Sequence, residues 1–65
     1  MGMTTKQLTE AQILEVQDRA IRTKDTALLH AAWSALGYDR RYAFQPATER
    51  QRKAGMERCA AELGL

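Results

Sequence analysis

Residues 25–36, with the sequence DTALLHAAWSAL, constrain the fold of this chain most, because they hold its densest apolar run and its only tryptophan. At about 100° per residue, the leucines, the tryptophan and two of the alanines fall on one broad face. The members of this face are Leu28, Leu29, Ala32, Trp33, Ala35 and Leu36. Such a width is typical of a helix with neighbours on two sides. Asp25 is placed to cap the start of this helix and Gly37 to end it.

Two interpretations of Trp33 stay open at this stage. The simpler one makes it the main core residue, and the other makes it an exposed anchor for a partner, since protein interfaces are enriched in tryptophan. His30 lies at the edge of the same face, and the chain has no second histidine. We therefore interpret His30 as a boundary residue and expect no metal site.

A further helix is predicted over about residues 9–23, after a polar segment without periodicity (residues 1–7) that we expect to be frayed. Thr9 and Gln12 have the spacing of a capping box, and Leu8 stands where a hydrophobic staple would begin. No Gly or Pro interrupts the chain up to Leu36, so one long helix is possible. The apolar face of this helix consists of Ile13, Val16, Ala20 and Ile21, with Leu14 at its edge. This face nevertheless shifts by roughly 60° before Asp25. We prefer a break there, giving a helical hairpin; a continuous helix would better suit a lengthwise dimer.

The third helix is predicted over about residues 46–63. Pro46 suits a first helical turn, and Thr48 with Gln51 offers a second capping box, so the helix could begin at either place. One side is expected to carry Arg52, Met56, Cys59, Ala60 and Leu63. Gly55 either weakens this helix, by about 1 kcal/mol relative to alanine, or permits a close crossing over the second helix.

These three helices make the predicted fold class all-α, a small three-helix bundle forming one domain over residues 1–65. A chain of 65 residues is near the lower limit for folding on its own core without disulfides, metal or a partner chain. Much of its hydrophobic fraction is alanine. A homodimer, or docking onto a larger protein, would remedy this shortage, and we leave self-association open.

The sequence lacks the residue constellations that enzymes use. It has one His, one Cys, no histidine pair at helical spacing and no Gly-rich phosphate loop. Cys59 lies on an apolar stripe, where a small buried thiol is the usual explanation. We therefore expect no catalytic residue, no enzyme activity and no cofactor. The single cysteine and the lack of a signal peptide favour a cytoplasmic setting, and no apolar run approaches the ~20 residues of a membrane span.

Charge and aromatic residues concentrate late in the chain. Residues 40–58 hold six Lys or Arg against two Glu, although the whole chain is only +2. Within residues 37–46, GYDRRYAFQP, aromatic side chains either fold back over the core, Tyr38 included, or form a patch for a partner. Our candidate partner-binding residues are Arg40, Arg41, Tyr42, Phe44, Arg50, Arg52 and Lys53. Aromatic anchors and Arg–carboxylate pairs would supply the contacts.

Nucleic-acid binding through the same basic residues is an alternative. Two observations weigh against it. A helix-turn-helix motif has a turn of 3–4 residues, whereas about nine residues separate the second and third predicted helices. Glu49 and Glu57 also interrupt the basic region.

The segments LTEAQILEVQDRAI (residues 8–21), ALLHAAWSALG (27–37) and ERCAAELG (57–64) resemble small helical proteins of bacteriophages and prophages. Such chains commonly begin with a capped helix and end with an Ala-rich one. The resemblance implies a stoichiometric inhibitor or modulator of a bacterial host protein, defence nucleases and transcription machinery included. We therefore expect a non-catalytic protein-binding module in the host cytoplasm. A purely structural homodimeric subunit, with Trp33 and the alanine faces at its interface, is a further alternative.

Overall fold

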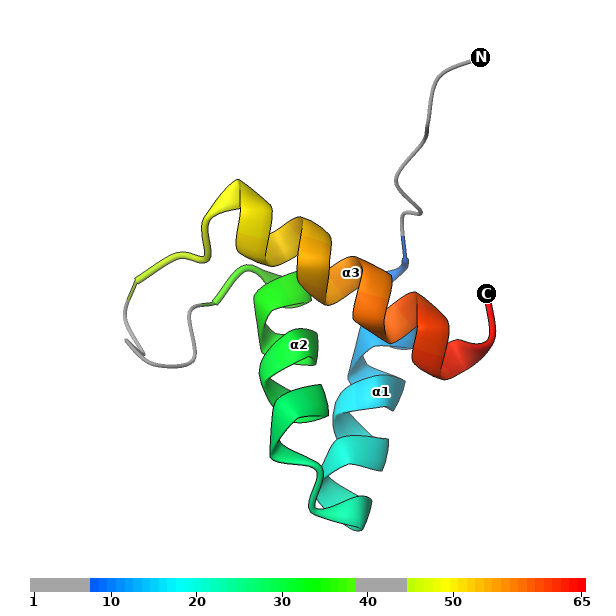
Figure 1. The fold of residues 1–65 in the computed structure, drawn as a ribbon. Coiled ribbons are helices and arrows are strands. Elements are labelled where there is room, and N and C mark those ends of the chain that lie inside the picture. Colours follow the sequence, from blue (N-terminus) through cyan, green and yellow to red (C-terminus); the bar gives the residue numbers. More distant parts are fainter. Residues whose placement is uncertain (1–7, 39–44) are drawn as a thin grey trace.

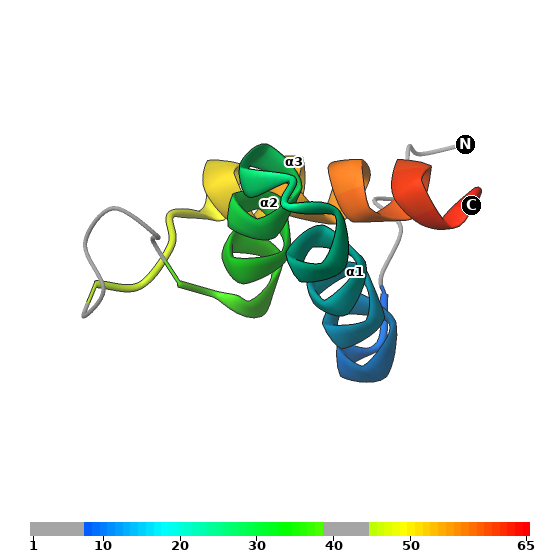
Figure 2. The ribbon, with the colours of Figure 1, turned by 90° about the horizontal axis from the view of Figure 1, so that it is seen from below.

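Three helices pack together in the computed structural model, which describes residues 8–38 and 45–65. They are α1 (Glu10–Thr23), α2 (Thr26–Leu36) and α3 (Glu49–Leu63). α1 and α2 run antiparallel as a hairpin, and α3 lies across one face of it, near the end where α1 begins and α2 ends (Figure 1). Figure 2 shows the same hairpin from below, with α3 on one side of both helices. The predicted three-helix bundle is confirmed.

Both predicted capping boxes are formed. The Thr9 hydroxyl accepts a hydrogen bond from the Gln12 amide (3.1 Å), and the Thr9 amide donates to Gln12 Oε1 (2.8 Å). Thr48 and Gln51 repeat the arrangement at the start of α3, with the same two distances. α3 therefore begins after Thr48, and Pro46 precedes the helix.

The chain breaks between α1 and α2 at Lys24, which takes a left-handed conformation (φ 57°). The Asp25 amide donates back to the carbonyl oxygen of Ala20 (2.9 Å), which closes the end of α1. Asp25 Oδ1 then accepts from the Leu28 amide (3.1 Å) and caps α2. The helical hairpin is confirmed, and the alternative of one continuous helix is wrong.

α3 crosses α2 in very close contact at Gly55. A Cβ atom built on this glycine would lie 2.4 Å from the carbonyl oxygen of Ala31, 2.8 Å from the amide nitrogen of Ala35 and 3.1 Å from Ser34 Cβ. Real Cβ atoms do not approach other atoms so closely, so only glycine fits here. Of the two interpretations of Gly55, the close crossing is correct.

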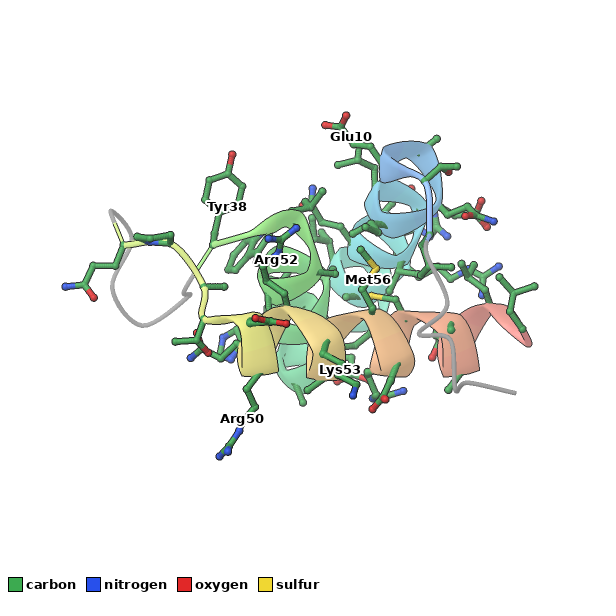
Figure 3. The ribbon with its side chains drawn as sticks, turned by 90° about the horizontal axis from the view of Figure 1, so that it is seen from above. Glu10, Tyr38, Arg50, Arg52, Lys53 and Met56 are labelled. Atoms are coloured by element: carbon green, nitrogen blue, oxygen red, sulfur yellow. The ribbon has the colours of Figure 1, made fainter. Side chains whose placement is uncertain are left out.

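The core is built mainly from small side chains. Its buried members are Leu8, Ile13, Val16, Ala20, Leu28, Ala32, Ala35, Cys59 and Ala60. Trp33 is only partly buried, so its prediction as the main core residue is wrong. Arg52 lies on the side of α3 that carries Met56 (Figure 3), but it is exposed and does not join the core. Trp33, the bulkiest side chain of the hairpin, therefore lies at the edge of the core.

A chain of ion pairs joins the three helices along one side. Arg19 of α1 pairs with Glu15 (2.9 Å) and reaches α3, where it contacts the Glu62 carboxylate (3.7 Å) and donates to the Glu62 carbonyl oxygen (3.2 Å). Arg58 of α3 lies between Glu62 (3.7 Å) and Asp25 (3.8 Å). These groups are all substantially exposed, so each pair contributes only about 0–1 kcal/mol.

Candidate protein-binding surfaces

The first turns of α3 present three exposed cations, Arg50, Arg52 and Lys53. Figure 3 shows Arg50 and Lys53 pointing away from the hairpin, whereas Arg52 lies on the opposite side of α3, the side of Met56. The structure therefore brings Arg50 and Lys53 together and sets Arg52 apart from them. The three surround the start of the helix and do not form a single flat patch.

These three cations differ from Arg19, Arg22 and Arg58 in having no ion-pair partner among residues 8–38 and 45–65. Arg19 and Arg58 belong to the chain of ion pairs described above. Arg22 pairs with Asp18 at 2.6 Å. Arg58, which contributed to the basic count of residues 40–58, is therefore directed toward the hairpin and does not extend the cationic surface.

Two acidic side chains share this part of α3. Glu49 and Glu57 are both exposed, so the surface of α3 alternates in sign. A phosphate backbone favours a continuous run of cations. Glu49 and Glu57 interrupt such a run along α3.

The remaining candidates, Arg40, Arg41, Tyr42 and Phe44, lie outside the described residues. The chain on either side of them is joined by an antiparallel bridge between Tyr38 and Pro46, and the Ala47 amide donates to the Gly37 carbonyl oxygen (2.9 Å). Tyr38 is 58% exposed, so the prediction that it covers the core is wrong. Its ring adds an exposed aromatic near the end of α2 (Figure 3).

A second surface, which we call the outer hairpin face, consists of Leu14, Gln17 and Ile21 on α1 with Leu29 and Trp33 on α2. Leu14 is 44% exposed and Ile21 is 55% exposed. The other three are partly buried. Helical spacing predicted Leu14, Ile21 and Leu29 in or beside the core, and of these apolar residues only Trp33 was considered as an exposed anchor.

This face is directed away from α3. On α1, Arg19 marks the side of α3 through its contacts with Glu62, and Leu14 and Ile21 lie roughly 140–160° around the helix from it. On α2, Ala31 lies under Gly55 of α3, and both Leu29 and Trp33 are about 160° from it. The view along the hairpin shows α3 on one side only (Figure 2).

Trp33 spans the two helices of the outer hairpin face. Its Nε1–H donates to Gln17 Oε1 (3.0 Å), and its ring stacks with His30 at a centroid distance of 6.2 Å and an interplanar angle of 23°. An indole that is partly buried and hydrogen-bonded through nitrogen is a stiff apolar surface element. Trp33 thus packs at the boundary of the core, between the two interpretations that its sequence position allowed.

A hollow of about 230 Å³ opens beside Ile21, near the turn between α1 and α2. It is lined by Ala20, Ile21, Lys24, Asp25, Thr26 and Leu29. Most of its exposed wall is apolar carbon, with the charged groups of Lys24 and Asp25 at the turn. Its size suits one side chain of a partner.

Cys59 is fully buried among the helices. Burial raises the pKa of its thiol, with Arg58 lowering and Glu62 raising it to smaller extents. A thiol held protonated in this way is a poor nucleophile. Within the described ranges, no group of three or more His, Cys, Asp or Glu is placed to hold a metal ion. None of the three helices is long and apolar enough to cross a membrane.

Comparisons with protein-family models, with curated proteins and with solved structures found no match to this chain.

Proposed function

We propose that this chain is a small non-catalytic protein-binding module that recognises an acidic surface of a bacterial host protein and modulates or inhibits that protein. The contact surface consists of the start of α3 and residues from the segment that precedes it in the sequence. Its residues are Arg40, Arg41, Tyr42, Phe44, Arg50, Arg52 and Lys53. The nature of the partner follows from the resemblance to small phage proteins.

The observation that carries this proposal is the difference between two sets of cations. Arg19, Arg22 and Arg58 already have carboxylate partners within the chain. Arg50 and Lys53 have none among the described residues and extend into solvent. A guanidinium forms charge-assisted, bidentate hydrogen bonds with a carboxylate, so Arg50 is available for a carboxylate supplied by another molecule.

The helix that carries these cations is held firmly. Its start is fixed by the capping box at Thr48, and its middle is locked against α2 at Gly55. A rigid support lowers the ordering cost of binding. Opposite charges across an interface also steer encounter and raise the association rate, an effect that salt weakens.

The test is affinity capture from a bacterial lysate, run with and without nuclease, and repeated with Lys53→Glu. The matched control is Arg22→Glu, which makes the same change of charge on α1 and loses one exposed ion pair worth about 0.2–0.5 kcal/mol. We expect a nuclease-resistant, near-stoichiometric host protein that binds the wild type and Arg22→Glu but is largely lost with Lys53→Glu. Equal loss with both variants would refute the assignment to α3.

The same experiment separates the nucleic-acid alternative. Capture that disappears on nuclease treatment, and affinity that falls steeply with salt for any DNA or RNA sequence, would replace this proposal with nucleic-acid binding. With the protein partner, the captured protein stays bound after nuclease, and moderate salt mainly slows association.

A further inference from the structure

We infer that the outer hairpin face binds the same face of a second copy of this chain, with the two α1 helices antiparallel about a two-fold axis near Gln17. This interface lies on the opposite side of the hairpin from α3. It is therefore independent of the proposed function, and a dimer formed in this way would present two α3 surfaces outward.

The first argument is a seam along α1. Glu10, Leu14, Gln17 and Ile21 follow one another in steps of four, three and four residues, and Lys24 caps the helix three residues further on. This spacing keeps them on one side of a helix, as in the seams by which two helices pack together. Glu10, Leu14, Ile21 and Lys24 are all exposed, and Figure 3 shows Glu10 on the side of the hairpin away from α3.

The second argument is that this seam is complementary to itself. A two-fold axis makes each contact occur twice, so a residue must fit its counterpart at the mirrored position. With the axis near Gln17, Leu14 lies opposite the second copy's Ile21. Glu10 approaches the second copy's Lys24, and neither has an ion-pair partner among the described residues of its own chain. Acid and base occupy opposite ends, and the apolar residues lie between them.

The third argument is the match of a protrusion with a hollow. The hollow of about 230 Å³ borders Ile21 and Leu29, toward the Lys24 end of the seam. The antiparallel arrangement directs the second copy's Leu14 to this place. Each Leu14 would then fill a hollow on the other chain, and the exposed faces of Ile21 and Leu29 would lose their contact with water. Burial of such apolar area is the main driving force of association.

The choice of a second copy as the binding partner rests on this complementarity and on the composition of the core. Apart from Leu8, Ile13, Val16 and Leu28, the buried core of residues 8–38 and 45–65 consists of alanines and Cys59. Leu14, Ile21 and Trp33, which are bulkier, keep part of their surface exposed. The alanine face that could have served a dimer is used within the chain, because Ala31 and Ala35 lie under Gly55. A second copy would cover the bulky residues that α3 leaves exposed.

The test is the molar mass of the full chain, measured by light scattering during gel filtration over a range of concentrations. We expect the wild type to reach twice 7.3 kDa and Leu14→Lys to stay at 7.3 kDa. The matched control is Leu65→Lys, since Leu65 is 54% exposed but lies outside the face, and it should behave as the wild type does. Circular dichroism serves to check the fold of each variant. We expect both variants to stay folded, because both leucines are exposed.

The register is tested by cross-linking. Gln17→Cys lies at the axis and should give a covalent dimer under mild oxidation, whereas Arg22→Cys, on another side of α1, should not. The wild type controls for Cys59, which is buried and should not cross-link. Exchanging the charges gives a second readout. Glu10→Lys and Lys24→Glu should each raise the dissociation constant of the dimer at least severalfold, and the variant with both substitutions should recover much of the lost affinity.

Several outcomes would overturn the inference. One is a wild-type chain that remains at 7.3 kDa up to millimolar concentration; another is a dimer that Leu14→Lys leaves intact. Equal cross-linking through Gln17→Cys and Arg22→Cys would reject the two-fold arrangement. Lys53→Glu should not change the molar mass, so the dimer and the proposed function stand or fall separately.

Discussion

Gly55 of α3 lies so close to Ala31 of α2 that a Cβ atom on the glycine would stand 2.4 Å from the alanine carbonyl oxygen. Backbone atoms of α2 cannot move aside as a flexible side chain would. We therefore predict that Gly55→Ala destabilises the fold by about 1–3 kcal/mol, the usual cost of an overpacked contact. This is opposite in sign to the gain of about 1 kcal/mol that alanine gives over glycine within a helix. Urea denaturation followed by circular dichroism measures the difference.

Ala54→Gly provides the matched control for this prediction. Ala54 is the exposed neighbour of Gly55, so its replacement should cost only the helix-propensity difference, about 1 kcal/mol. If Gly55→Ala raised the midpoint of unfolding, α3 could not cross α2 as the structure has it.

The local features of the fold were predictable because they depend on a few neighbouring residues. A capping box at Thr9, a second at Thr48 and the N-cap at Asp25 each satisfy backbone amides within three residues. The shift of the apolar face before Asp25 likewise indicated the break. These signals identify where helices begin and end, and they suffice for a three-helix architecture.

The placement of individual side chains was less predictable, because it depends on where α3 crosses the hairpin. α3 crosses near one end, so its first turns carry Arg52 in solvent although helical spacing put it with Cys59. Trp33 faces away from α3, donates to Gln17, stacks with His30 and is partly buried. Periodicity identifies an apolar face but does not say which portion of it a third helix will cover.

For the candidate site, the sequence identified cations but not their availability. Arg50 and Arg58 look equivalent in the charge count. The structure separates them, because Arg58 contacts both Asp25 and Glu62, whereas Arg50 points away from the hairpin. That distinction depends on pairs far apart in sequence. The outer hairpin face was missed for the same reason, since Ile21 was assigned to the core by its spacing alone.

Asp25 has two structural roles that substitutions can separate. Its Oδ1 caps α2 through the Leu28 amide, and its Oδ2 approaches Arg58 at 3.8 Å. Asp25→Asn keeps an N-cap acceptor and loses only the exposed ion pair, so we predict a loss of at most about 0.5 kcal/mol. Asp25→Ala loses both and should cost about 1–2 kcal/mol. Thermal and urea unfolding of the two variants would show whether the N-cap hydrogen bond stabilises the fold more than the ion pair with Arg58 does. Equal losses of stability in the two variants would contradict this prediction.

Cys59 should make the stability of the fold depend on alkaline pH. Burial raises the pKa of its thiol above the ordinary value of 9.0, so the unfolded chain loses this proton at a lower pH than the folded chain does. The unfolded state then binds fewer protons, and the free energy of unfolding falls as pH rises. The contribution is fully present below pH 9.0 and is lost above it, by at most about 1.4 kcal/mol per pH unit.

The variant Cys59→Ala isolates this effect from the other groups that titrate in the same range. It should be less stable than the wild type at pH 7, because a buried side chain is shortened. The difference in the free energy of unfolding between the two proteins should narrow as the pH rises above 9.0. If this difference stayed constant with pH, the thiol would ionise equally well in the folded and the unfolded chain. Slow reaction of the native thiol with a disulfide reagent, accelerated by urea, is an independent check of its burial.

Arg19 should hold the end of α3 to α1. It donates to the Glu62 carbonyl oxygen at 3.2 Å and contacts the Glu62 carboxylate at 3.7 Å, whereas Arg22 pairs only within α1, with Asp18, among the contacts of the described residues. Arg19→Met keeps an apolar stem and removes the charge and the donors. We predict a loss of about 0.5–1.5 kcal/mol for Arg19→Met and no more than about 0.5 kcal/mol for Arg22→Met. Amide hydrogen exchange gives the local readout, since Arg19→Met should speed exchange in the last turn of α3 around Glu62 while Arg22→Met leaves it unchanged.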